Sequence, residues 1–69
     1  MITMESIRNK LIEAIKQSGL TQTEIGKRLN VSQQTVSHYL KGDKMPALDT
    51  FANLCKILDL DANEILCIQ

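Results

Sequence analysis

Side chains that can form hydrogen bonds with DNA bases gather within two helical turns near the middle of the chain. Gln33 and Gln34 are followed one turn later by Ser37 and His38, and helical spacing places all four on one face. A glutamine amide can pair with N6 and N7 of adenine, and the serine hydroxyl and the imidazole ring can donate or accept. These four residues are predicted to contact bases. The competing interpretation is that they are ordinary solvated residues of a helix.

A short helix is predicted directly before this stretch. Thr21 and Glu24 have the spacing of a capping box, so the helix should begin at Gln22. Ile25 and Leu29 lie four residues apart and give the helix one apolar face. We expect this face to pack against the rest of the protein.

The helix that carries the four polar residues is predicted over 33–41. Asn30 tolerates a left-handed backbone and can end the preceding helix, while Ser32 can cap the next one. Gly42 should end the second helix. Its inward positions are Val36 and either Tyr39 or Leu40.

The combined stretch, TQTEIGKRLNVSQQTVSHYLKG, resembles the helix-turn-helix of the Cro and phage-repressor (XRE-type) DNA-binding domains. Gln22 opens the first helix, Gly26 is the small residue where the two helices cross closely, and Gln33 opens the second helix. The similarity continues through GDKMPALDTFANLCKILDLDANEIL and covers nearly the whole chain. It implies one lambda-repressor-like domain over 1–69 that binds double-stranded DNA sequence-specifically. The implied role is a transcriptional regulator, and specifically a repressor, with recognition helix 33–41 in the major groove. The apolar slots of the motif are filled by Leu29, Val31 and Val36.

Five residues around the motif are predicted to contact the DNA backbone. Thr21 and Gln22 stand at a helix N-terminus, where free N–H groups favour a phosphate. The resemblance implies that Gln22 clamps the backbone and helps to orient the glutamines of the recognition helix. Lys41 and Lys44 follow that helix and can reach phosphates, although a surface lysine often only adds solubility. Tyr39 is interpreted mainly as a packing residue whose hydroxyl can contact a phosphate.

The remaining sequence predicts three more helices, and hence an all-α, compact bundle of five short helices. The first covers about 4–18 with Gly19 as its cap, and the fourth covers about 48–58 after a loop that contains Pro46. The apolar residues expected to face the core from these two helices are Met4, Ile7, Leu11, Ile12, Ala14 and Ile15, and Leu48, Phe51, Leu54, Cys55 and Leu58.

The fifth helix is predicted from Ala62 over the residues up to Gln69, because Asp61 and Glu64 repeat the capping-box spacing. This helix is apolar on more than one side and cannot bury every apolar residue in one small core. One face is therefore predicted to bind a partner. The residues assigned to this dimer interface are Ile65, Leu66 and Ile68.

The charges are distributed unevenly along a chain whose net charge is zero. Residues 27–44 hold four basic side chains and one acidic side chain, a net charge of +3, whereas residues 45–69 have a net charge of −3. This pattern is typical of a DNA-facing surface backed by an acidic side. Because the positive excess is small, we expect modest affinity from one domain and a homodimer on a two-fold operator. The alternative is a protein-interaction module of the same fold, such as an antitoxin that binds a toxin, or an accessory subunit of a regulator.

Enzymatic chemistry is not predicted. The chain lacks a nucleophile with an assignable base, a glycine-rich phosphate loop and any histidine–cysteine cluster, so no cofactor or metal site is expected. Cys55 is interpreted as a small buried apolar residue, and a disulfide at Cys67 is the minority interpretation. No apolar run is long enough to span a membrane and no signal sequence is recognisable. We therefore expect a cytoplasmic protein.

Overall fold

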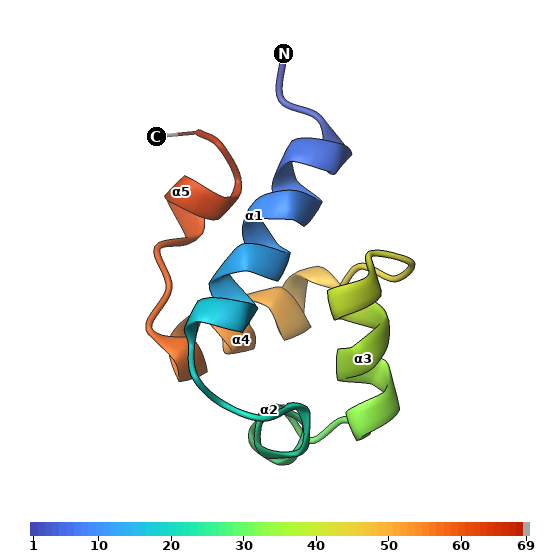
Figure 1. Cartoon of the computed structure of the whole chain (residues 1–69). Coiled ribbons are helices and arrows are strands. Elements are labelled where there is room, and N and C mark those ends of the chain that lie inside the picture. The colour runs from blue at the N-terminus through green and yellow to red at the C-terminus, as the bar shows by residue number, and fades with distance from the viewer. Residues whose placement is uncertain (69) are drawn as a thin grey trace.

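Residues 1–68, which the computed structural model describes, form five helices and no strand. The helices are α1 (Met4–Gln17), α2 (Gln22–Leu29), α3 (Gln33–Lys41), α4 (Leu48–Leu58) and α5 (Ala62–Ile65). In Figure 1, α1 runs between α5 on one side and α3 on the other, and α2 lies at the end of the molecule farthest from both chain ends. The predicted all-α bundle of five short helices is confirmed.

Local capping groups set the starts of the first three helices. Thr3 caps α1 by accepting a hydrogen bond from the backbone N–H of Ser6. Thr21 and Glu24 form both halves of the predicted capping box at α2, and Ser32 caps α3. These groups satisfy backbone N–H donors that have no acceptor within the helix. The predicted starts of α2 and α3 are therefore confirmed.

Left-handed residues end the helices of the motif, as predicted. Asn30 has φ 59° at the end of α2, and Gly42 has φ 82° at the end of α3. Gly19 follows α1 with φ 77°. Asn and Gly adopt this conformation at lower cost than other residues. The chain can therefore reverse within a few residues between α2 and α3, which holds the two helices close together.

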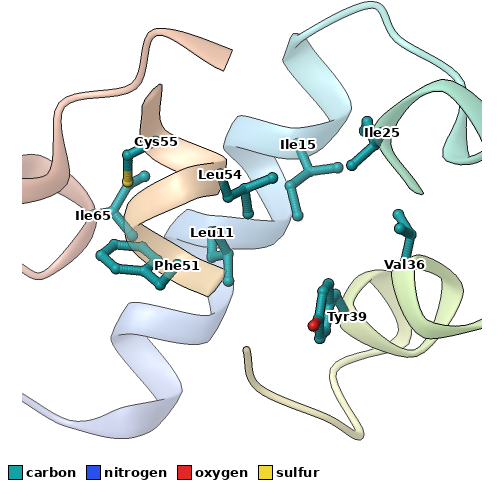
Figure 2. Close-up of a cluster of buried hydrophobic side chains, with 9 residues drawn as sticks. All are labelled: Leu11, Ile15, Ile25, Val36, Tyr39, Phe51, Leu54, Cys55 and Ile65. Carbon is teal, nitrogen blue, oxygen red and sulfur yellow. The ribbon is translucent and has the colours of Figure 1, made fainter. Parts of the chain in front are cut away.

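An apolar core joins all five helices (Figure 2). Leu11 and Leu54 lie at its centre with 1% and 0% of their surfaces exposed, so α1 and α4 form the base on which the other helices pack. With one Phe and one Tyr in the chain, the core is mainly aliphatic and depends on close side-chain packing. The buried members are Leu11, Ile15, Ile25, Val36, Tyr39, Phe51, Leu54, Cys55 and Ile65.

Two residues that were predicted to face the core are exposed. Leu48 has 84% and Met4 has 57% of its surface exposed. Each is the first residue of its helix. Because helical Cα–Cβ bonds tilt toward the N-terminus, the side chain of a first residue extends beyond the helix and past the core. Helical periodicity alone predicted the correct stripe but did not account for this end effect.

The C-terminal segment differs most from the prediction. Helix α5 ends at Ile65 after one turn, and Cys67 adopts a left-handed backbone with φ 62°. Asp61 caps α5 by accepting a hydrogen bond from the N–H of Asn63, but its predicted capping box with Glu64 does not form among the described residues. Ile65 is 4% exposed and belongs to the core. Its assignment to a dimer interface is therefore wrong; the predicted end of the helix at Gln69 lies outside the described residues.

Candidate nucleic-acid interface

The turn between α2 and α3 depends on a close backbone approach at Gly26. The N–H of Val31 donates to the carbonyl oxygen of Gly26 at 2.9 Å. A Cβ atom built on Gly26 would lie 2.9 Å from the carbonyl oxygen of Val31 and 3.4 Å from the nitrogen of Gln33. The predicted close approach at Gly26 is confirmed, but the nearest atoms belong to the backbone of the turn and of the first residue of α3, not to a crossing of the two helices.

Helix α3 divides into a buried face and an outward face. Val36 is 0% and Tyr39 is 4% exposed, so both side chains anchor α3 in the core. Gln33 and Gln34 are exposed at the first two helical positions, and Ser37 and His38 are partly exposed one turn later. The structure therefore brings the four predicted base-contacting residues together on the outward side of one helix.

The start of α2 presents a second group of donors beside this face. The Thr21 hydroxyl accepts from the Glu24 N–H at 3.1 Å and donates to Glu24 Oε1 at 3.1 Å, so this hydroxyl is engaged by the cap. Glu24 Oε1 also accepts from the Thr21 N–H. The N–H groups of Gln22 and Thr23, in the first turn, have no intrahelical acceptor. They are the groups that can bind an anion here, with the Gln22 side chain partly exposed beside them.

The end of α3 carries the predicted phosphate-binding lysines. Lys41 and Lys44 are both exposed. Tyr39, by contrast, packs in the core, and its burial raises the pKa of its hydroxyl above the ordinary value of 10.0. Its packing role is confirmed, whereas its contact with a phosphate stays a prediction with little exposed surface to support it.

A hydrogen-bonded pair at the end of α3 was not predicted. His38 Nδ1 lies 2.9 Å from Asp43 Oδ1, and the two side chains are 41% and 57% exposed. The left-handed backbone of Gly42 turns the chain back along the helix, which brings Asp43 beside the preceding turn. In the sequence, Asp43 is recognisable only as a negative charge, because a separation of five residues across a helix end follows no helical rule.

Arg8 on α1 also supports the recognition helix. A Cβ atom on Gly42 would lie 3.0 Å from Arg8 Cδ and 3.6 Å from Ile12 Cδ1, so these side chains pack against the end of α3. A cation near a helix C-terminus is favourable because the carbonyl groups there carry partial negative charge. Within the described residues, the buried Nε of Arg8 has no hydrogen-bond partner. The packing of Arg8 against the end of α3 follows from the contact between α1 and α3. The sequence predicts both helices but not which of their side chains meet.

Acidic side chains gather on the side of α1 away from α3. Glu13, Asp59, Asp61 and Glu64 line a hollow of about 470 Å³, with Lys10 at its edge. This hollow is formed by α1 and the segments around α5, which lie on the opposite side of α1 from α3 in Figure 1. The arrangement agrees with the predicted separation of charges. Among residues 1–68, no group of histidine, cysteine or acidic side chains could hold a metal ion, and no helix is both long and apolar enough to cross a membrane.

Comparison with known proteins agrees with this geometry. A family model described as helix-turn-helix matches residues 11–65, which include the second half of α1, the motif, α4 and α5. The chain is also similar to the uncharacterized HTH-type transcriptional regulator YgzD of Bacillus subtilis (strain 168). The two are 27% identical over 63 residues, which cover 91% of this chain and 96% of that protein. No solved structure matches the chain. The chain belongs to the XRE-type family of helix-turn-helix DNA-binding domains.

Proposed function

We propose that this chain is a sequence-specific, double-stranded-DNA-binding transcriptional regulator that acts as a homodimer on a two-fold operator. The outward face of α3 is the observation that carries the proposal. It presents two glutamines, a serine and a histidine on a helix that the core fixes from the other side. A helix of this kind fits the major groove, where its N-terminal residues meet the base edges.

Replacing the glutamines tests the base contacts. Gln33→Ala and Gln34→Ala should each cost about 1–3 kcal/mol on the best operator and much less on random DNA, because only the specific complex uses a bidentate amide–adenine pair. The operator is first found by selecting bound sites from random double-stranded DNA, and binding is then measured by fluorescence anisotropy. Asn53→Ala, at an exposed position of α4, is the matched control. Equal losses on operator and random DNA would contradict the base contacts.

Replacing a lysine tests the phosphate contacts. Lys44→Ala should weaken binding to all sequences alike and reduce the slope of log K against log salt by about one unit, since one fewer counterion is released. Lys56→Ala removes the same charge from an exposed position of α4, on the segment with net negative charge, and should leave the slope unchanged. A slope that stays the same in Lys44→Ala would remove this residue from the interface.

The dimer surface that we propose is an apolar groove rather than the whole C-terminal segment. The groove has a volume of about 220 Å³, and its walls include Met4, Met45, Leu48 and Leu66. It lies where the start of α1, the loop before α4 and the residues after α5 meet. Leu66 of the predicted interface lines this groove, and Ile68, which is 59% exposed, lies two residues farther along the chain.

A second copy of this chain fits the groove because the same surface supplies both a projection and a hollow. Leu48, 84% exposed, projects at the rim of the groove that it helps to line. In a two-fold interface the same patch meets itself, so each copy must offer a projecting side chain and a space to receive its partner's. The small positive excess of residues 27–44 also favours pairing, because two linked recognition helices bind far more tightly than one.

A single charge on Leu48 tests this surface without disturbing the fold. Leu48 is the first residue of α4, where an acidic side chain favours the helix, so Leu48→Asp should remain folded. We expect this variant to be monomeric in sedimentation experiments and to bind the two-fold operator no better than a half-site. Asn53→Asp adds the same charge at an exposed position of α4 and should stay dimeric. A dimeric Leu48→Asp variant would place the interface elsewhere.

Two further measurements decide between repression and activation, and between DNA binding and the protein-interaction module. We assign repression because a domain that occupies an operator excludes other proteins from the same DNA, so transcription from an overlapping promoter should fall when the chain is expressed. A rise in transcription would instead make the protein an activator. A stable monomer without affinity for DNA at physiological salt would support the protein-interaction module, with the apolar groove available to a toxin or another protein.

A further inference from the structure

We propose that Asp43 determines which bases His38 can recognise by fixing the position of the proton on the imidazole ring. The proposal rests on the proposed function, since it assumes that the outward face of α3 meets the base edges. It assigns Asp43 as a positioning residue, because its carboxylate acts on the DNA through His38. The observation behind it is the 2.9 Å contact between His38 Nδ1 and Asp43 Oδ1.

The chemistry of the pair leaves one arrangement of hydrogen bonds. An ionised carboxylate can only accept hydrogen bonds, so His38 Nδ1 must carry the hydrogen and donate it to Asp43. In a neutral imidazole ring, one nitrogen carries a hydrogen and the other has a free lone pair. His38 Nε2 is therefore an acceptor whenever the ring is neutral and the contact is formed.

The ring of His38 belongs to the outward face of α3, which is the predicted DNA surface. His38 lies one turn after Gln34 on α3, on the side opposite the buried residues Val36 and Tyr39. With 41% of its side chain exposed, the ring can reach a partner outside the domain. Asp43 is the one acidic side chain in the positively charged segment 27–44, where an unpaired carboxylate would oppose phosphate binding. The hydrogen bond to His38 gives the Asp43 carboxylate a specific role, which is to hold the hydrogen on Nδ1 of the ring.

An acceptor at His38 Nε2 selects base pairs by their amino groups. In the major groove, adenine N6 and cytosine N4 offer hydrogen-bond donors, whereas guanine N7 and O6 and thymine O4 are acceptors. We therefore expect His38 to favour adenine or cytosine at the base that it meets. Without Asp43, the ring could also place its hydrogen on Nε2 and donate to guanine or thymine, so the preference would relax.

The proton position can be measured without DNA. Nitrogen-15 NMR of the free protein at about pH 8, where an ordinary imidazole ring is mostly neutral, distinguishes the two nitrogens by their chemical shifts. We expect Nδ1–H in the wild type and predominantly Nε2–H in Asp43→Ala. Asp43→Glu keeps a carboxylate, which can only accept, near the ring and should retain Nδ1–H. Predominant Nε2–H in the wild type would overturn the proposal, whatever the protein does with DNA.

Site selection with the same variants then tests the consequence. The wild type should prefer adenine or cytosine at one position by about 2- to 12-fold, the range expected for one neutral hydrogen bond. Asp43→Glu should keep the preference, because its carboxylate can only accept. Asp43→Ala should lose most of it and should change nothing further in a His38→Ala background. An unchanged preference in Asp43→Ala would overturn the proposal. If the wild type binds no DNA, the proposed function fails, while the NMR result still decides the role of Asp43.

Discussion

The helix-turn-helix (α2, the turn and α3) and the C-terminal segment after α4 contain the same kinds of local signal, namely helix caps and left-handed residues. The two regions nevertheless form different amounts of helix. Each has a helix capped by an acidic or hydroxyl side chain, and each contains left-handed residues that are not glycine, Asn30 in the motif and Asp59 and Cys67 in the segment. In the motif, both helices are capped at their starts and end at left-handed residues, and two complete helices form. In the C-terminal segment, Asp61 bonds only to the N–H of Asn63, the predicted capping box with Glu64 does not form among the described residues, and α5 makes a single turn.

The comparison indicates that local signals determine structure when neighbouring signals agree. In the motif, the cap at Thr21, the small residue Gly26 and the left-handed Asn30 all favour the same helix–turn–helix path. In the C-terminal segment, Ile65 is held by contacts with the rest of the core rather than by its own helix.

Removing the anchor of the C-terminal segment should have the largest effect. Ile65→Ala should lower the free energy of unfolding by about 2–5 kcal/mol, since it leaves a cavity in the core. Ile65→Val should cost about 0.5–1.5 kcal/mol. Ile2→Ala, at a 47% exposed position before α1, should change stability by less than about 0.5 kcal/mol. Urea denaturation measures all three, and similar values for Ile65→Ala and Ile2→Ala would place Ile65 outside the core.

A larger side chain at Gly26, where α2 approaches the turn, should have the second-largest effect on stability. Gly26→Val should cost about 1–3 kcal/mol, because its side chain would meet the Val31 carbonyl and the turn backbone would have to move. Ala52→Val introduces a branched side chain at an exposed position of α4 and should cost only a few tenths of a kcal/mol, at about the level of helix propensity. If Gly26→Val lowered the free energy of unfolding no more than Ala52→Val, the close approach at the turn would not limit the size of the side chain at position 26.

The caps of the two regions should differ in how much they contribute to the free energy of unfolding. Thr21→Ala should cost about 0.5–2 kcal/mol, because it removes a cap on which a complete helix depends. Asp61→Ala should lie at the low end of that range, because Asp61 accepts one hydrogen bond, from Asn63, and caps a single turn. Thr23→Ala, which removes a threonine that caps nothing on α2, is the control. A larger loss for Asp61→Ala in thermal denaturation would reverse the comparison.

Alkaline pH should produce the smallest effect, first through Cys55 on α4, whose pKa is influenced by Asp61 of the C-terminal segment, and then through Tyr39 of the motif. Burial and the nearby Asp61 raise the pKa of the Cys55 thiol above 9.0, and burial raises the pKa of Tyr39 above 10.0. Each group then loses its proton more readily in the unfolded chain, so stability is complete below the unfolded pKa and falls as pH rises through the folded pKa. Cys55→Ala should flatten the loss that begins near pH 9, and Tyr39→Phe the loss that begins near pH 10. Unchanged pH profiles in urea denaturation would contradict both assignments.

Most of the fold was predictable because its signals are short-range. Caps, helix periods and the family resemblance located all five helices, and the outward position of Gln33 and Gln34 followed from the position of Val36. The exposure of Leu48 and the burial of Ile65 were not predictable, because each depends on how a helix end meets other helices rather than on spacing along the chain. The His38–Asp43 pair escaped prediction for a related reason, since a left-handed Gly42 had to turn the backbone before the two side chains could meet.

The packing of α5 against α1 has a consequence for how the chain folds. Helices α2 and α3 are neighbours in sequence, so their contacts need only a short loop to close, whereas α1 and α5 must bring together the two ends of the described chain. Closing a longer loop costs more entropy and is slower. We expect the DNA-facing pair of helices to form early, and the α1–α5 contact to form late and to open first in hydrogen exchange. The half of the domain that meets DNA would then remain packed on α1 and α4 while α5 separates from α1 and rejoins it.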